Sequence, residues 1–63
     1  MNANEMLQYV RDHYDAAREE SDKLFGKFRD GKIDIDTWML KDMRLAGMRE
    51  AYAGMLGALG VIP

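Results

Sequence analysis

The sequence AYAGMLGALGVIP, residues 51–63, contains no charged residue, although charged residues are frequent in the rest of the chain. All nine Lys and Arg and all eleven Asp and Glu lie between Glu5 and Glu50. Apolar surface of this extent is unfavourable in water. Because the chain is short, we expect this segment to be covered by another molecule.

The length of 63 residues allows a single domain, residues 1–63. A domain of this size buries only about 60% of the surface that its unfolded chain exposes. The chain has no cysteine, which excludes stabilisation by disulfides. Association is the remaining common way to stabilise so small a domain, so we expect a homo-oligomer or a subunit docked on a larger assembly.

The charge and hydropathy patterns give a first indication of location and partners. The net charge of −2 is close to balance and provides no general attraction to nucleic acid. The first residues are polar and no apolar run follows them, so no secretion signal is expected. The uncharged C-terminal segment is shorter than the ~20 residues that span a bilayer. We therefore expect a cytoplasmic protein and no membrane partner.

The first half of the chain is predicted to form a helix over about residues 4–29, with Asn4 as its N-cap. Apolar and small residues recur there at alternating spacings of three and four, which is typical of helices that pack side by side. We call these positions the seam; they are Ala3, Leu7, Val10, Tyr14, Ala17, Ser21, Leu24 and Phe28. The opposite side is charged and is predicted to face solvent.

A turn is predicted over residues 30–35, because Gly31 can adopt the left-handed conformation that ends helices. The second helix is predicted over about residues 36–58, followed by an apolar tail, 59–63, with its last three residues extended. Either Asp34 or Asp36 can cap this helix, and the sequence does not distinguish between them.

The second helix carries two apolar rows. The row of large side chains consists of Trp38, Leu45, Met48, Tyr52, Met55 and Leu59. The row of mostly small residues consists of Leu40, Met43, Gly47, Ala51, Gly54 and Ala58. One antiparallel neighbour covers a single contact line, whereas a four-helix bundle of two hairpins covers both rows.

The sequence thus predicts an all-α fold, a two-helix antiparallel hairpin that assembles into a helical bundle or docks on a larger assembly. The predicted partner or oligomer interface consists of Trp38, Leu45, Met48, Ala51, Tyr52, Gly54, Met55, Ala58, Leu59 and Ile62.

The sequence predicts no catalytic or metal-binding site. Residues 30–34 match the centre of a calcium-binding loop, but the first, third and twelfth ligand positions fall on Gly26, Phe28 and Thr37. His13 has no acidic or histidine neighbour four residues away, the spacing of paired helical ligands. No nucleophile, base and orienting group can be placed together. We expect no catalytic residue, no cofactor and no metal, and hence no enzyme.

Two other classes stay open. A nucleic-acid-binding hairpin dimer would use a basic and aromatic patch near the turn, made of Lys23, Lys27, Arg29 and Lys32 with Phe25 and Phe28. A membrane-active peptide would insert its uncharged C-terminal tail into a bilayer.

One further pattern spans residues 24–60. A helix ends in glycine, an isoleucine and a tryptophan follow, and a basic, methionine-containing helix ends in small and apolar residues; the positions are Gly31, Ile33, Trp38, Met43, Arg44, Ala58, Leu59 and Gly60. This stretch is similar to a helical segment of phage head-morphogenesis and minor virion proteins, which are much longer. The resemblance implies a structural or assembly role within a virion and transfers no catalytic residue.

Overall fold

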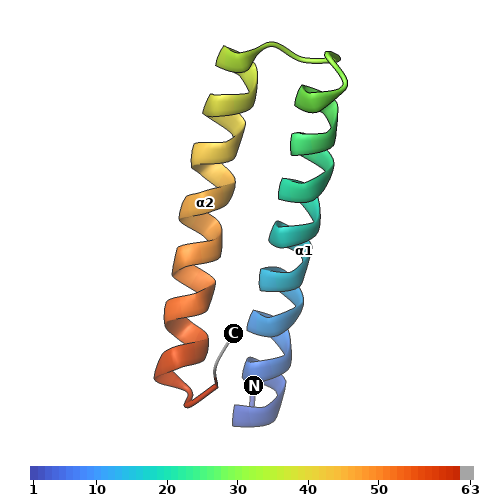
Figure 1. The fold of residues 1–63 in the computed structure, drawn as a ribbon. Helices are drawn as coiled ribbons and strands as arrows, with labels where there is room; N and C mark the ends of the chain where they lie inside the picture. Colours follow the sequence, from blue (N-terminus) through green and yellow to red (C-terminus); the bar gives the residue numbers. More distant parts are fainter. Residues whose placement is uncertain (62–63) are drawn as a thin grey trace.

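The computed structural model describes residues 1–61, which form two antiparallel helices joined by a short turn (Figure 1). Helix α1 spans Ala3–Arg29 and helix α2 spans Ile35–Ala58. The helices pack against each other along their length, and the molecule is elongated, 43 × 18 × 14 Å. The prediction of an all-α antiparallel hairpin is confirmed.

Helix α1 begins two residues earlier than the predicted cap allows. The side-chain oxygen of Asn2 accepts a hydrogen bond of 2.8 Å from the Glu5 N–H. The Asn2 amide in turn donates to the Glu5 carboxylate at 2.8 Å. Glu5 stands three residues after Asn2, the spacing of a reciprocal capping box, which Asn4 does not have. The prediction of Asn4 as the N-cap is therefore wrong, and Asn4 lies inside the helix.

Both helices end in the same backbone motif. At the end of α1, Gly31 has φ +75° and the Lys32 N–H bonds to the Lys27 carbonyl at 2.9 Å. At the end of α2, Gly60 has φ +81° and the Val61 N–H bonds at 2.8 Å to the carbonyl five residues earlier. These are Schellman motifs, and a positive φ at that position favours glycine. Gly31 thus adopts the left-handed conformation considered for it, and α2 ends at Ala58.

The second helix is capped by Asp34, which settles the choice that the sequence leaves open. Its carboxylate accepts a hydrogen bond of 2.7 Å from the Thr37 N–H. Hydrogen bonds from the Thr37 side chain and then from its backbone lower the pKa of Asp34 below its ordinary value. The helix accordingly starts at Ile35, while Asp36 lies in its first turn, where a negative charge is favoured.

The core is a single line of contact between the helices. From α1, the predicted seam supplies the buried residues Val10, Ala17, Ser21 and Leu24. From α2, the buried residues are Leu45 and Leu56, and Leu56 is only 1% exposed. Leu56 belongs to neither row recognised in the sequence. It lies on one face with the buried Leu45 and the partly buried Trp38 and Tyr52, and this face is the one that meets α1.

Candidate functional site

Helix α2 is apolar on two opposite sides, and the hairpin covers only one of them. The uncovered side is the row of mostly small residues; we call it the outer face of α2, made of Leu40, Met43, Gly47, Ala51, Gly54 and Ala58. All six are exposed, and Leu40 and Met43 keep 72% and 68% of their surface in solvent. The apolar face of a helix normally packs against a neighbouring element. This face therefore lacks a neighbour within the hairpin.

The predicted interface residues divide between the two sides of α2. The structure directs four of them, partly or fully buried, into the hairpin: Trp38, Leu45, Met48 and Tyr52. Five others are exposed: Ala51, Gly54, Met55, Ala58 and Leu59. Ile62 lies outside the described residues. In the folded hairpin α1 covers most of the first group, whereas the second group remains exposed to a partner.

Packing within the hairpin does not require glycine at two positions in the middle of the outer face. A Cβ atom built on Gly47 or Gly54 meets no atom within 4 Å. Glycine inside a helix is unfavourable by about 1 kcal/mol relative to alanine. Gly47 and Gly54 are seven residues apart, so both lie on one stripe along the helix. The outer face thus offers bare backbone to a neighbouring molecule.

The corresponding outer face of α1 has the opposite character. It carries exposed charged and polar residues, namely Gln8, Arg11, Asp12, Asp15, Glu19 and Asp22. A charged helix face of this kind is solvated and gains little from contact with an apolar surface. The apolar surface that lacks a neighbour is therefore concentrated on α2.

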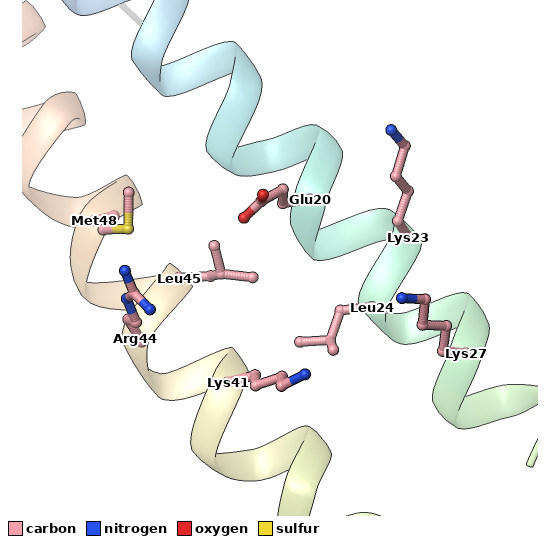
Figure 2. Close-up of a pocket in the computed structure, with 8 residues that line it drawn as sticks. All are labelled: Glu20, Lys23, Leu24, Lys27, Lys41, Arg44, Leu45 and Met48. Carbon is pink, nitrogen blue, oxygen red and sulfur yellow. The ribbon is translucent and has the colours of Figure 1, made fainter. Parts of the chain in front are cut away.

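A groove of about 550 Å³ runs between the two helices on one side of the hairpin, near the turn (Figure 2). Its lining residues are Glu20, Lys23, Leu24 and Lys27 from α1 and Lys41, Arg44, Leu45 and Met48 from α2. Among the residues that the structure describes, four cationic side chains and a single carboxylate thus line the groove. The sequence alone does not indicate the other lining residues, Lys41, Arg44 and Glu20, as part of a site. Their proximity to the two lysines of α1 depends on how the two helices are aligned.

The basic and aromatic patch considered for nucleic-acid binding is divided by the fold. Lys23 and Lys27 line the groove, whereas the Phe28 ring stacks on Trp38 at 5.0 Å with an angle of 16° between the rings. Phe25 meets the same indole edge-on at 6.4 Å. Residues two apart on a helix differ by about 200° in direction. The Phe25 ring therefore lies away from the two lysines that flank it in the sequence.

His13 is engaged in local packing. Its Nδ1 lies 2.8 Å from the Tyr9 carbonyl oxygen, and its ring lies 4.0 Å from the Tyr9 ring. The Tyr52 ring on α2 is 5.7 Å away, so His13 sits between tyrosines of both helices. Within residues 1–61, no group of three or more His, Cys, Asp or Glu side chains is placed to hold a metal ion.

Two other findings bear on function. Neither helix among the described residues is long and apolar enough to cross a membrane. In comparisons with known proteins, no family model, no curated protein and no solved structure matches this chain. The fold and the surfaces described above are therefore the basis for assigning a function.

Proposed function

We propose that this protein is a non-catalytic structural or assembly subunit that associates with a second copy of itself through the outer face of α2. The observation that supports this proposal is the exposed, uncharged outer face on a helix whose other face is already packed. Burial of that face against an identical one removes apolar surface from water on both copies at once.

The exposed surface area of the hairpin supports a second copy of the chain as the partner. The hairpin exposes 4842 Å². A monomeric protein of 7.2 kDa typically exposes about 4,100 Å². The excess is of the order of the ~800 Å² that each partner contributes to a standard protein interface. One partner is thus enough to bring the exposed surface to the usual value.

The distribution of charge favours α2 against α2 as the contact. The outer face of α1 is charged, so burying it would remove ionised groups from water without partners. On α2, no charged residue follows Glu50, and Gly47 and Gly54 let another helix approach closely. Two hairpins joined in this way place four helices together with both apolar sides of each α2 covered.

The resemblance of residues 24–60 to a segment of phage head-morphogenesis and minor virion proteins supports the more specific form of the proposal, an assembly role in a virion. The self-association itself does not depend on that resemblance, because it is argued from the exposed surface alone.

The proposal is tested by measuring the mass in solution by light scattering over a range of concentrations. We expect the wild-type protein to approach twice 7.2 kDa as the concentration rises. Met43→Glu places a charge on the outer face and should remain at 7.2 kDa. Met6→Glu is the matched control, since Met6 is an exposed methionine on the other helix, and it should behave like the wild type.

Circular dichroism establishes that both variants keep their helices, because neither substitution alters a buried position. A wild-type protein that stays at 7.2 kDa at every concentration would rule out self-association through this face. Equal weakening by Met6→Glu and Met43→Glu would show that the contact lies elsewhere.

A further inference from the structure

The groove between the helices has features that self-association through the outer face of α2 does not explain. We infer that it is a docking site for an amphipathic helix of another protein, one whose apolar stripe is bordered by acidic residues. This inference names a second surface and a second partner. It does not rest on the proposed self-association.

The rims of the groove are cationic on both sides. Lys23 and Lys27 come from α1, and Lys41 and Arg44 come from α2. Figure 2 shows the Lys27 and Lys41 side chains extending toward each other across the opening. Like charges that converge in this way repel, and an acidic partner relieves the repulsion. Because the whole chain carries −2, the excess of positive charge is a property of this location.

The floor of the groove is apolar. Leu24 and Leu45 are buried and point toward each other between the helices, and the partly buried Met48 continues the floor along α2 (Figure 2). Methionine adapts its shape to a partner and is frequent on surfaces that bind other proteins. An apolar floor with charged rims is the arrangement in which an amphipathic helix lays its apolar side into a groove.

The position of the groove between the two helices also suits a third helix. The groove runs between two helices packed side by side, so a third helix laid there contacts both, as neighbouring helices in a bundle do. The bordering acidic side chains of that third helix then lie next to the cations on both rims. Among the described residues that line the groove, Glu20 is the one carboxylate, and it lies on the side farther from the turn (Figure 2). The two ends of the groove therefore differ in charge.

Nucleic acid fits this site less well. Single-stranded nucleic acid gains affinity from bases stacked on exposed aromatic rings as well as from phosphate contacts. The groove has no aromatic lining residue among those the structure describes. The nearby Phe28 ring already stacks on Trp38.

A second copy of this chain is also a poor occupant. The acidic residues on the outer face of α1, Asp12, Asp15, Glu19 and Asp22, have no apolar stripe between them to fill the floor. The apolar seam of that helix is covered by its own α2.

The test uses the full chain and a fluorescent synthetic peptide of three heptads, with Leu at the two core positions and Glu at the two flanking positions of each heptad. Binding is followed by anisotropy and located by amide chemical shifts. We expect the shifts to cluster at residues 23–27 and 41–48, and the affinity to fall as salt rises.

Two double variants with equal charge change separate the groove from general electrostatics. Lys23→Glu with Lys27→Glu should weaken peptide binding by more than about tenfold. Arg11→Glu with Lys32→Glu alters two exposed cations outside the groove and should leave the affinity within about twofold. Light scattering keeps this result independent of self-association, since the groove variant should retain the wild-type mass and Met43→Glu should still bind the peptide.

Several outcomes would overturn the inference. Absence of binding by the acidic peptide would do so, as would equal binding of a peptide with Lys in place of Glu. If oligothymidylate bound with shifts at the same residues and displaced the peptide, the groove would be a nucleic-acid site instead. Equal weakening by the two double variants would show that the groove has no particular role.

Discussion

Leu56 is the most deeply buried side chain of the hairpin, yet it comes from the part of α2 with the weakest intrinsic preference for helix. Gly54 and Gly57 flank it, and neither stabilises a helical backbone. Leu56 also supplies the carbonyl that closes the Schellman motif with Val61. Packing of this one side chain against α1 therefore holds the last turn of α2 in place.

Truncating Leu56 to alanine should lower the free energy of unfolding by about 2–5 kcal/mol, because it removes a fully buried side chain and leaves a cavity. Leu40→Ala is the matched control at an exposed position and should have little effect at low protein concentration. Urea unfolding followed by circular dichroism measures both. Similar losses for the two variants would contradict the assignment of the core.

Asp34 is expected to give the hairpin a specific dependence on pH. Its pKa is lowered in the folded protein, so its contribution to stability is complete above its ordinary value of 3.8 and is lost as the pH falls through the lower, folded-state pKa. Asp34→Ala should lower the melting temperature at neutral pH, because the cap is lost.

Asp34→Asn keeps a capping oxygen but cannot titrate in this range. The melting temperature of this variant should fall less than that of the wild type as the pH is lowered from about 5 to about 2. Thermal melts at a series of pH values test this expectation. Parallel losses in the wild type and in Asp34→Asn would show that the stabilisation does not depend on this ionisation.

At the scale of elements, the two helices differ in how well their contacts could be predicted from the sequence. The charges of α1 leave a single apolar stripe, so the positions of Val10, Ala17 and Leu24 follow from spacing alone. On α2 both sides are apolar, and spacing gives two rows without saying which one α1 covers. The line that does meet α1 includes the partly buried Asp42 and Arg49, whose polarity conceals it in the sequence.

The lining of the groove could not be predicted from the sequence for a related reason. Lys23 and Lys27 belong to the basic patch that the sequence indicates near the turn, but Lys41 and Arg44 lie across an interhelical contact. Which residues of α2 stand opposite α1 depends on the length of the turn and on the cap that starts α2. Since the sequence allowed either Asp34 or Asp36 as that cap, the alignment of the helices was undetermined by two residues.

Gly54→Ala should have opposite effects on the stability of the hairpin and on its self-association. In dilute solution it should stabilise the hairpin by up to about 1 kcal/mol, because the added methyl group meets nothing and helix propensity improves. At high concentration it should weaken self-association, because the methyl group holds a neighbouring helix away. Gly57→Ala, outside the outer face, is the control and should raise stability without altering the mass measured by light scattering.

For the whole molecule, stability and association are expected to be linked. A partner that binds the folded hairpin and not the unfolded chain raises the apparent stability with concentration. The melting temperature of the wild type should therefore rise as the protein concentration is increased, whereas that of Met43→Glu should stay constant. A constant melting temperature for the wild type, measured over a wide range of concentrations by calorimetry, would argue against self-association.

The charged outer face of α1 has a consequence for the size of any assembly. If two copies meet through α2, both copies turn α1 outward, and the charged outer face of α1 is solvated. An isologous contact of this kind is closed by its own two-fold symmetry and leaves no free end to which further copies can add. Replacement of acidic residues on α1 by apolar ones would then supply a new end, and the expected product is a growing fibre instead of a finite particle.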